Sequence, residues 1–259
     1  MHKVQRVRSA LVLCLTMALV AFSAQAQEVL HVYGPGGPAP AMKEAAQVFG
    51  AANNIAVEVT AGPTPQWVEM AKANADVVFS GAENMMSEFA KALPGAFELE
   101  KAEPLYLRPA AILVRPGNPK HIHGFRDLLK PGVKVMAVAG AGQTGLWEDV
   151  AGRTGDIAMV RAFRKNLVLP EAPNSAEARK RWTEQPDIDV WLIWNIWQVA
   201  NPSLAQLVEV DEPFRIYRDT GVVLTHKGAE REQAKAFVAF LQSPQGQSIF
   251  GKWGWKTTP

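Results

Sequence analysis

The chain has 259 residues, of which 27 are Lys or Arg, 25 are Asp or Glu and 48% are hydrophobic. Lys3, Arg6 and Arg8 fall within the first 26 residues, which contain no acidic residue, so 24 basic residues face 25 acidic ones in the rest of the chain. A balance this close to neutral argues against a nucleic-acid or anionic-membrane partner. The length allows one large domain or two smaller lobes, each with a hydrophobic core.

The N-terminal segment has the order of a secretory signal. Its basic start is followed by an apolar run over residues 10–22 and by the small residues of Ala24-Gln25-Ala26. This run of about 13 residues is shorter than the roughly 18 that a membrane-spanning helix needs. We therefore expect residues 1–26 to be a signal peptide cut near Ala26, and the mature protein to work in the periplasm. The only cysteine, Cys14, lies in this segment, so the mature chain cannot form a disulfide.

Strand-like and helix-like segments then alternate along the chain. In order, the pattern predicts a strand at 29–33, a helix at 39–50, a strand at 55–60, a helix at 65–74, a strand at 76–79 and a helix opening at Ser80-Gly81. Further strands are predicted at 110–114, 133–139 and 190–193, with helices starting near Gly145 and Asn174. Such alternation predicts an α/β fold with a mostly parallel sheet flanked by helices.

Two stretches interrupt the alternation. Residues 103–109 and 208–217 carry prolines and are predicted to be extended connectors. The tail at 230–255 is predicted to form two helices, and Ser243-Pro244 suits the cap and first turn of the second.

Several predicted strands end in a small or polar loop that opens a helix. These loops are Gly34–Pro38, Ser80-Gly81, Gly140–Gly145 and Pro173–Ser175. The first turn of a helix has unpaired N–H groups and a partial positive charge, so such loops at the strand ends of an α/β sheet favour binding of an anion. Ser80 with Glu83 and Asn174 with Glu177 also fit the capping box, which leaves a purely structural role open for both loops.

The loop Gly140–Gly145 matches the G-x-G-x-x-G pattern of dinucleotide-binding proteins. We disfavour a nucleotide because the acidic residue expected about 20 positions later is poorly placed. We therefore interpret this loop as a glycine-rich turn suited to an oxyanion, a phosphate or a carboxylate.

Charged and aromatic residues near these loops complete the candidate site. Arg108 could supply a fixed positive charge to a bound anion, whereas Arg179 is better explained as a solvated or ion-paired side chain. Trp194 could form a wall of a cleft or belong to the core. His121 and His123 lack partner ligands, so we expect no metal and no cofactor.

Features of an enzyme are missing from the sequence. No serine or cysteine nucleophile has an adjacent base motif, and no carboxylates are paired at a spacing that suggests acid–base catalysis. We therefore predict a binding protein with no catalytic residues.

The motifs together resemble the accessory colonization factor AcfC family of periplasmic solute-binding proteins, which is related to the sulfate and molybdate receptors. The resemblance rests on Tyr33–Pro38, Gly62–Trp67, Ala75-Asp76, Ser80–Met86, Gly140–Asp149, Gly152–Thr154 and Asn174-Ser175, with a similar closing helix at Leu241–Trp255. It covers nearly the whole mature chain in order. It implies a type II periplasmic binding protein fold, in which two α/β lobes are joined by two crossover strands and hold the ligand between them.

Under this resemblance, lobe I would combine residues 27–106 with 212–259, and lobe II would be residues 107–211. The ligand-binding residues expected are Gly36, Gly37, Gln66, Ser80, Gly81, Arg108, Gln143, Thr144, Gly145, Asn174 and Ser175. The implied partners are a small anionic solute and a membrane permease, as in an ABC-type importer, or a chemoreceptor. A second copy of the chain stays open as a partner. The alternative is a surface antigen or colonization factor that acts through protein or cell-surface contacts.

Overall fold

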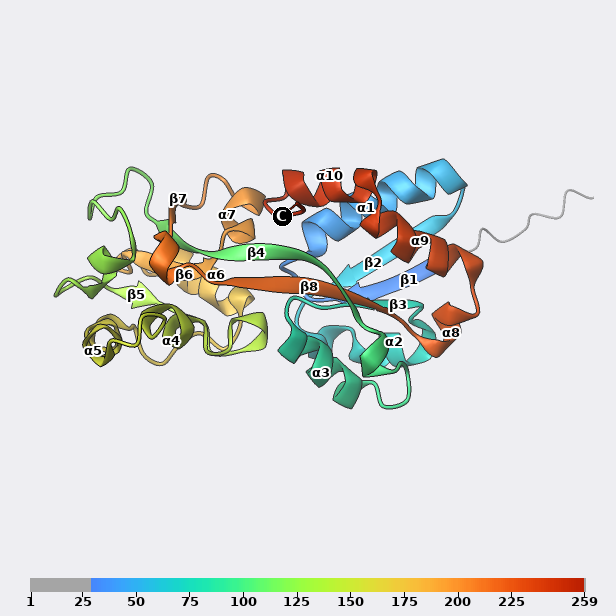
Figure 1. Cartoon of the computed structure of the whole chain (residues 1–259), viewed down its shortest axis with the longest axis horizontal. Coiled ribbons are helices and arrows are strands. Elements are labelled where there is room, and N and C mark those ends of the chain that lie inside the picture. Colours follow the sequence, from blue (N-terminus) through green and yellow to red (C-terminus); the bar gives the residue numbers. More distant parts are fainter. Residues whose placement is uncertain (1–28, 259) are drawn as a thin grey trace, which may run out of the picture.

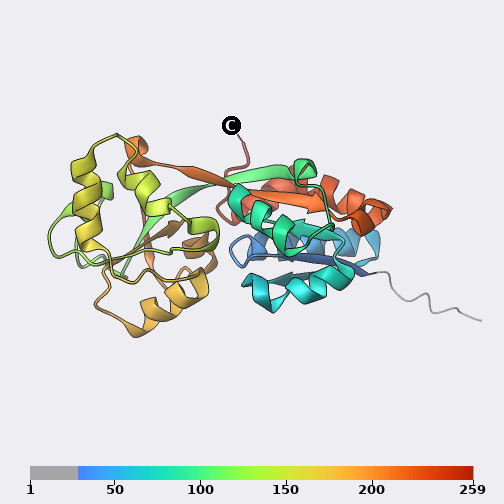
Figure 2. The same ribbon diagram turned by 90° about the horizontal axis from the view of Figure 1, so that it is seen from below.

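The computed structural model describes residues 29–258, and the expected signal peptide lies outside them. The chain forms two lobes side by side, joined by two long strands (Figures 1 and 2). The lobes are flanked by helices, and the loops that precede several of these helices meet between them.

Lobe I is built from both ends of the described chain. Its first part comprises β1 (Val29–Gly34), α1 (Ala39–Asn53), β2 (Ala56–Ala61), the short turn η1 (Thr64–Gln66), α2 (Val68–Asn74), β3 (Val77–Phe79), α3 (Glu83–Ala92) and η2 (Leu99–Lys101). Its second part comprises α8 (His226–Ala229), α9 (Glu232–Gln242) and α10 (Pro244–Lys252). In Figure 1 the red helices α9 and α10 lie beside the blue helix α1.

Lobe II comes from the middle of the chain. It comprises η3 (Phe125–Leu129), β5 (Val135–Met136), η4 (Ala141–Gln143), α4 (Leu146–Ala151), α5 (Ile157–Asn166), α6 (Ser175–Glu184), β6 (Val190–Trp194), α7 (Ile196–Ala200), β7 (Gln206–Glu209) and η5 (Glu212–Phe214).

Two long strands connect the lobes, β4 (Glu103–Val114) and β8 (Tyr217–Leu224). They pair antiparallel with each other from Glu103 opposite Val222 to Pro109 opposite Tyr217. Beyond this point β4 continues into lobe II, where Ala110–Val114 pairs with β6 on one side and with β7 on the other. A single strand therefore belongs to both lobes.

The eight strands are hydrogen-bonded in the order β2-β1-β3-β8-β4-β6-β5, with β7 paired to β4. The pairs β1–β2, β1–β3 and β5–β6 are parallel. All antiparallel pairs involve β4 or β8. The expected α/β class is confirmed, but the sheet is mixed rather than mostly parallel. In the described residues the crossover strands β4 and β8 form four antiparallel pairs, against three parallel pairs elsewhere.

The core follows the alternation of side chains along the strands. In lobe I, Val77 and Phe79 face α1 and the C-terminal helices, while Val78 faces α2 and α3 on the opposite side of the sheet. Phe49 of α1 packs against Phe237 of α9, with their ring centres 5.3 Å apart. The early and late segments of the chain therefore share one hydrophobic core.

The helices and strands predicted from the sequence occur in the predicted order, with three differences, whereas α5, α7 and β7 were not predicted. The connector at 103–109 is the first part of β4, and the second crossover is β8 at 217–224 rather than the predicted connector at 208–217. The strand expected at 133–139 is reduced to Val135-Met136 and one isolated pairing of Val138 with Ala172. The predicted cap of the last helix is confirmed, since the Ser243 hydroxyl accepts the N–H of Gly246 at 3.2 Å.

Candidate functional site

A cavity of about 180 Å³ lies between the lobes. Lobe I contributes the segments after β1, β2 and β3, and lobe II contributes η4, the start of α6 and the segment after β6. Ligands of open α/β sheets bind at the carboxyl ends of strands, where these segments lie. The volume is below the 300–1,000 Å³ typical of pockets for drug-sized molecules, so it suits a small solute.

The structure places seven of the eleven expected ligand-binding residues on the cavity wall. These are Gly36, Gly37, Gly81, Arg108, Gln143, Asn174 and Ser175. They come from four separate loops and from β4, so they meet only in the folded chain. Other wall residues include Thr64, Met85, Gly142 and Trp197.

The other four expected residues lie outside the cavity wall. Ser80 is fully buried against β8, where its hydroxyl accepts the N–H of Gly221 at 3.1 Å. Gln66 is exposed in η1. The Thr144 hydroxyl donates to the backbone of its own turn, to Ala141 O at 3.0 Å, and Gly145 has a φ of 72° that starts α4.

The two capping boxes predicted from the sequence have different outcomes. Asn174 caps α6, because its side-chain oxygen accepts the Glu177 N–H at 2.9 Å. The box at Ser80 and Glu83 is wrong, since α3 has Ala82 at its N-cap and no side-chain cap. Ser80 extends the β3–β8 pair, and its hydroxyl is used there rather than at the helix.

Arg108 is the buried cation of the cavity wall, with an exposed fraction of 2%. Its guanidinium carbon lies 4.7 Å from the ring centre of Trp194 and 4.9 Å from that of Trp255, so the side chain is held between two aromatic faces. One Nη donates to Asp219 O at 2.8 Å and the other to Gly81 O. The Nε atom has no hydrogen-bond partner among residues 29–258.

The charge of Arg108 is not neutralised by an ion pair within the described residues. Burial lowers its pKa to about 9, an effect that nearby Asp219 opposes and Arg218 reinforces. The side chain therefore stays cationic at neutral pH while it has lost most of its hydration. A buried charge in this state is stabilised by an anion that enters the cavity.

Three helix N-termini add to the positive potential at the cavity. The wall includes Gly36–Pro38 before α1, Gly81 before α3 and Asn174–Ala176 at the start of α6. These helices have 15, 10 and 10 residues, long enough for a developed dipole. The site thus combines a fixed cation with three helix N-termini.

Two tryptophans reach the cavity, and one of them, Trp194, also belongs to the hydrophobic core. Trp194 and Trp197 line the cavity, and the Trp194 indole donates to Gly142 O at 3.1 Å. Trp67, Trp147 and Trp191 pack in the hydrophobic cores. Met85 also lines the cavity but was not predicted as a site residue from the sequence. Its position in the first turn of a helix that follows a candidate loop could have indicated it.

The two lobes touch around the cavity. A Cβ atom built at Gly142 would lie 2.9 Å from Gly81 O and 3.2 Å from Arg108 Nη2. The Asn84 amide donates across the gap to Ala141 O at 3.2 Å. The lobes are therefore in a closed arrangement in which side chains at these positions must be small.

A polar cluster next to the cavity connects the crossover strand with lobe II. Arg218 of β8 donates to Thr144 O at 2.9 Å and forms an ion pair with Asp149 at 2.5 Å. On the adjacent side of β8, burial and the nearby Asp219 carboxyl raise the pKa of Glu83.

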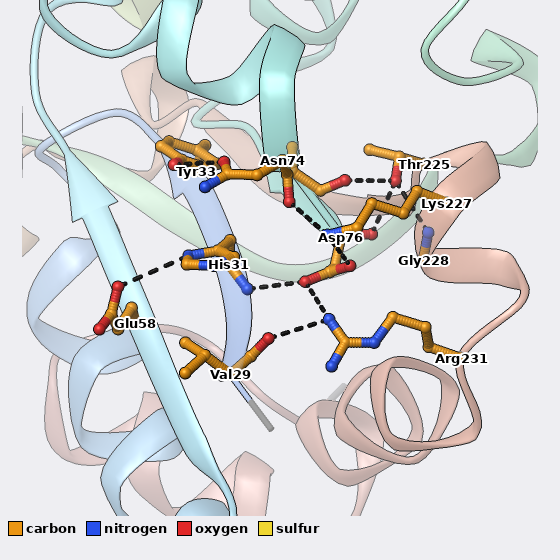
Figure 3. A network of polar contacts seen from close by, with 11 residues as sticks. Val29, His31, Tyr33, Glu58, Asn74, Asp76, Thr225, Lys227, Gly228 and Arg231 are labelled. Carbon is orange, nitrogen blue, oxygen red and sulfur yellow. Dashed lines mark hydrogen bonds and ion pairs between the residues drawn. The ribbon is translucent and has the colours of Figure 1, made fainter. Parts of the chain in front are cut away.

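A second polar network lies in lobe I, apart from the cavity (Figure 3). Asp76 is fully buried and accepts the His31 N–H at 2.8 Å and an Arg231 Nη–H at 2.6 Å, with Lys227 Nζ 3.0 Å from its other oxygen. Burial alone would raise the pKa of Asp76, but the donors from His31, Lys227 and Arg231 outweigh it and lower the pKa. This network fixes β1 to the segment around α8 and has a structural role.

The comparisons with known proteins agree with this geometry. A family model described as bacterial extracellular solute-binding protein matches residues 30–256. The chain belongs to this family. Its members are solute-binding proteins, which is the class predicted from the sequence in place of an enzyme.

Relatives of this solute-binding protein include anion-binding ones. The sulfate-binding protein of Escherichia coli is 30% identical over 166 residues, a match that covers 57% of this chain and 50% of that protein. The chain thus spans about half the length of the curated relatives it matches.

Among solved structures, Peb3 from Campylobacter jejuni has a TM-score of 0.82 and 32% identity over 88% of this chain and 100% of that one. A structure of PEB3 bound to L-phospholactate also has a TM-score of 0.82, with 34% identity and the same coverage. The sulfate-binding protein SubI from Mycobacterium tuberculosis has a TM-score of 0.74 with 18% identity over 90% of this chain and 88% of that chain, which is a likeness of fold. The two-lobe type II fold is therefore confirmed for this solute-binding protein.

Two further observations concern residues 29–258 of the solute-binding protein. No helix in this part is both long and apolar enough to cross a bilayer. No group of three or more His, Cys, Asp or Glu side chains is gathered there in a way that could hold a metal ion.

Proposed function

We propose that this protein is a periplasmic receptor that captures a small anion between its lobes and delivers it to the membrane permease of an ABC-type importer. The anion is an oxyanion, a phosphate ester or an organic carboxylate. The observation that carries this proposal is Arg108, a buried cation on the cavity wall with no ion-pair partner in the described chain.

The relatives support the same solute class. One is a sulfate-binding protein, and another was solved with L-phospholactate. Among solute-binding proteins we assign the chain to the AcfC-like group, on the loop motifs of the sequence. The signal peptide at residues 1–26 and the periplasmic location belong to the same proposal.

Binding is coupled to closure of the lobes in this proposal. The segments before β4 and after β8 move as one body and the segment between β4 and β8 moves as the other, with β4 and β8 as the hinge. A solute that contacts Gly37 on one side and Ser175 on the other stabilises the closed state, which a membrane partner can recognise.

A thermal-shift screen of the mature protein tests the function. The protein, refolded to remove any carried-over ligand, is heated with sulfate, molybdate, phosphate, phosphate esters or carboxylates. A solute at 100 times its Kd stabilises the folded state by about 2.7 kcal/mol, so the unfolding temperature rises with concentration. A flat response to all these anions refutes the proposal and favours a protein that acts through surface contacts.

A further inference from the structure

The cavity wall contains polar atoms that the protein itself leaves unpaired. Arg108 Nε, Trp197 Nε1 and Gln143 Oε1 are each buried and have no hydrogen-bond partner among residues 29–258. All three residues belong to the cavity wall. Buried polar groups are rarely left unpaired, because each costs about 1–3 kcal/mol. A bound solute is the natural partner for such a set.

Two of the three atoms are donors that suit an anion. Each Nη atom of Arg108 uses one N–H on a carbonyl, that of Asp219 or Gly81, and keeps a second N–H, while Nε–H has no partner in the described chain. The Trp197 indole lies beside Gly37, where a built Cβ would be 3.8 Å from Nε1. The anionic oxygens of a solute can accept hydrogen bonds from both groups.

The third atom cannot be paired by an anionic oxygen. Gln143 is 5% exposed, and its side chain forms no hydrogen bond within the described residues. Its carbonyl oxygen only accepts hydrogen bonds. A fully deprotonated oxyanion such as sulfate has no donor, so in this orientation of the amide it would leave Gln143 Oε1 unpaired and place negative charge near it. Gln143 pairs such an anion only by turning its amide so that Nε2–H faces the anion.

Building on the proposed anion receptor, we propose that the solute carries a hydrogen-bond donor of its own beside its anionic group, and that Gln143 selects for it. The donor is a hydroxyl group next to a carboxylate or a phosphate ester, or the proton of a hydrogen phosphate. The cavity then discriminates against anions of the same size and charge that lack the donor. A site built to pair a hydroxyl group rejects the analogue without it because its own buried group is left unpaired.

Pairs of anions that differ in one donor test this inference by isothermal titration calorimetry. Malate is compared with succinate, phosphoglycerate with phosphopropionate, and hydrogen phosphate with sulfate. For the pair that binds best, we expect the wild-type protein to prefer the donor-bearing member by tenfold or more. In Gln143→Met, which removes the acceptor at similar volume, the ratio of the two affinities falls to about one.

Two further variants make the ratio interpretable. Gln143→Glu keeps acceptor oxygens, so it retains the preference while its charge weakens both members of the pair. Gln206→Met, the same substitution at an exposed glutamine of β7 outside the cavity, leaves both affinities unchanged.

The outcomes separate this inference from the proposed function. Anion binding with equal affinity for both members of every pair overturns the inference and leaves the receptor function intact. A preference that persists in Gln143→Met also overturns it. Absence of binding by every anion removes the proposed function and this inference with it.

Discussion

Replacement of Arg108 by methionine is the most direct test of the cavity. Methionine keeps a long unbranched side chain that can still pack between Trp194 and Trp255, but it removes the charge and the free Nε–H. One hydrogen bond to a charged group is worth about 1.5–3 kcal/mol, and a charge pair at 4 Å about 4 kcal/mol at an effective dielectric constant of 20. Because these two contributions overlap, we expect the binding free energy to weaken by about 2–4 kcal/mol, which is roughly 30- to 700-fold in affinity.

Calorimetry with the best anion of the thermal-shift screen measures this loss. The control is Arg179→Met, which removes an exposed arginine of α6 outside the cavity and should change the affinity less than threefold. Because Arg108 also donates to two carbonyls, the unfolding of each variant is recorded to show that it is folded at the assay temperature. A folded Arg108→Met protein with affinity within threefold of wild type would refute the placement of the anion beside Arg108.

Three other changes test the surroundings of the site. Gly142→Ala places a methyl group against the Gly81 carbonyl across the cleft and should weaken solute binding about 5- to 150-fold with little change in ligand-free stability. The control Gly251→Ala in α10 should change neither affinity nor closure. Equal solute affinities of Gly142→Ala and the wild-type protein in calorimetry would contradict the closed arrangement. Asp76→Asn should lower the free energy of unfolding by roughly 2–3 kcal/mol at pH 7, measured in urea, without affecting solute affinity. The difference in unfolding free energy between wild type and Asp76→Asn should narrow as the pH falls below about 3.8, because only the ionised form of Asp76, whose pKa is lowered, stabilises the fold. A difference that stays constant with pH would show that the ionised carboxylate is not the cause. Glu83→Gln should raise the unfolding temperature at pH 7 and not at pH 4. The reason is that a carboxyl with a raised pKa destabilises the folded state only as the pH rises above about 4.5. A lower unfolding temperature of the variant at pH 7 would show that the ionised carboxylate is stabilising.

The sequence was sufficient for many local elements of the fold, although not for α5, α7 or β7. Apolar runs such as Val190–Trp194 and helix-opening loops such as Pro173–Ser175 carry their signal within a few residues. β8 was missed because its first half, Tyr217 to Thr220, is polar and gains its partners only from β4, more than a hundred positions earlier. Long-range pairing of this kind leaves no periodic pattern in the strand itself.

The candidate site could be predicted to the level of its loops. The sequence identifies the loops after the strands, and Arg108, Gly81 and Asn174 meet at the cavity as expected from them. It could not show that Ser80 points toward β8, since the direction of one hydroxyl depends on strand pairing. Nor could it show that both Nη atoms of Arg108 are already engaged, because their acceptors come from distant segments.

The path of the chain between the lobes has a consequence for the order of folding during export. Lobe II is a single continuous stretch between the two crossover strands, so all of its elements are available before β8 has been synthesised or translocated. Lobe I cannot close its core at that stage, because Phe49 of α1 packs against Phe237 and Phe240 near the other end of the chain. A chain threaded across a membrane from its N-terminus therefore leaves the face of α1 that carries Phe49 uncovered until the last helices arrive. The segment that emerges first is among the last to be buried, and it is the one most in need of protection from aggregation.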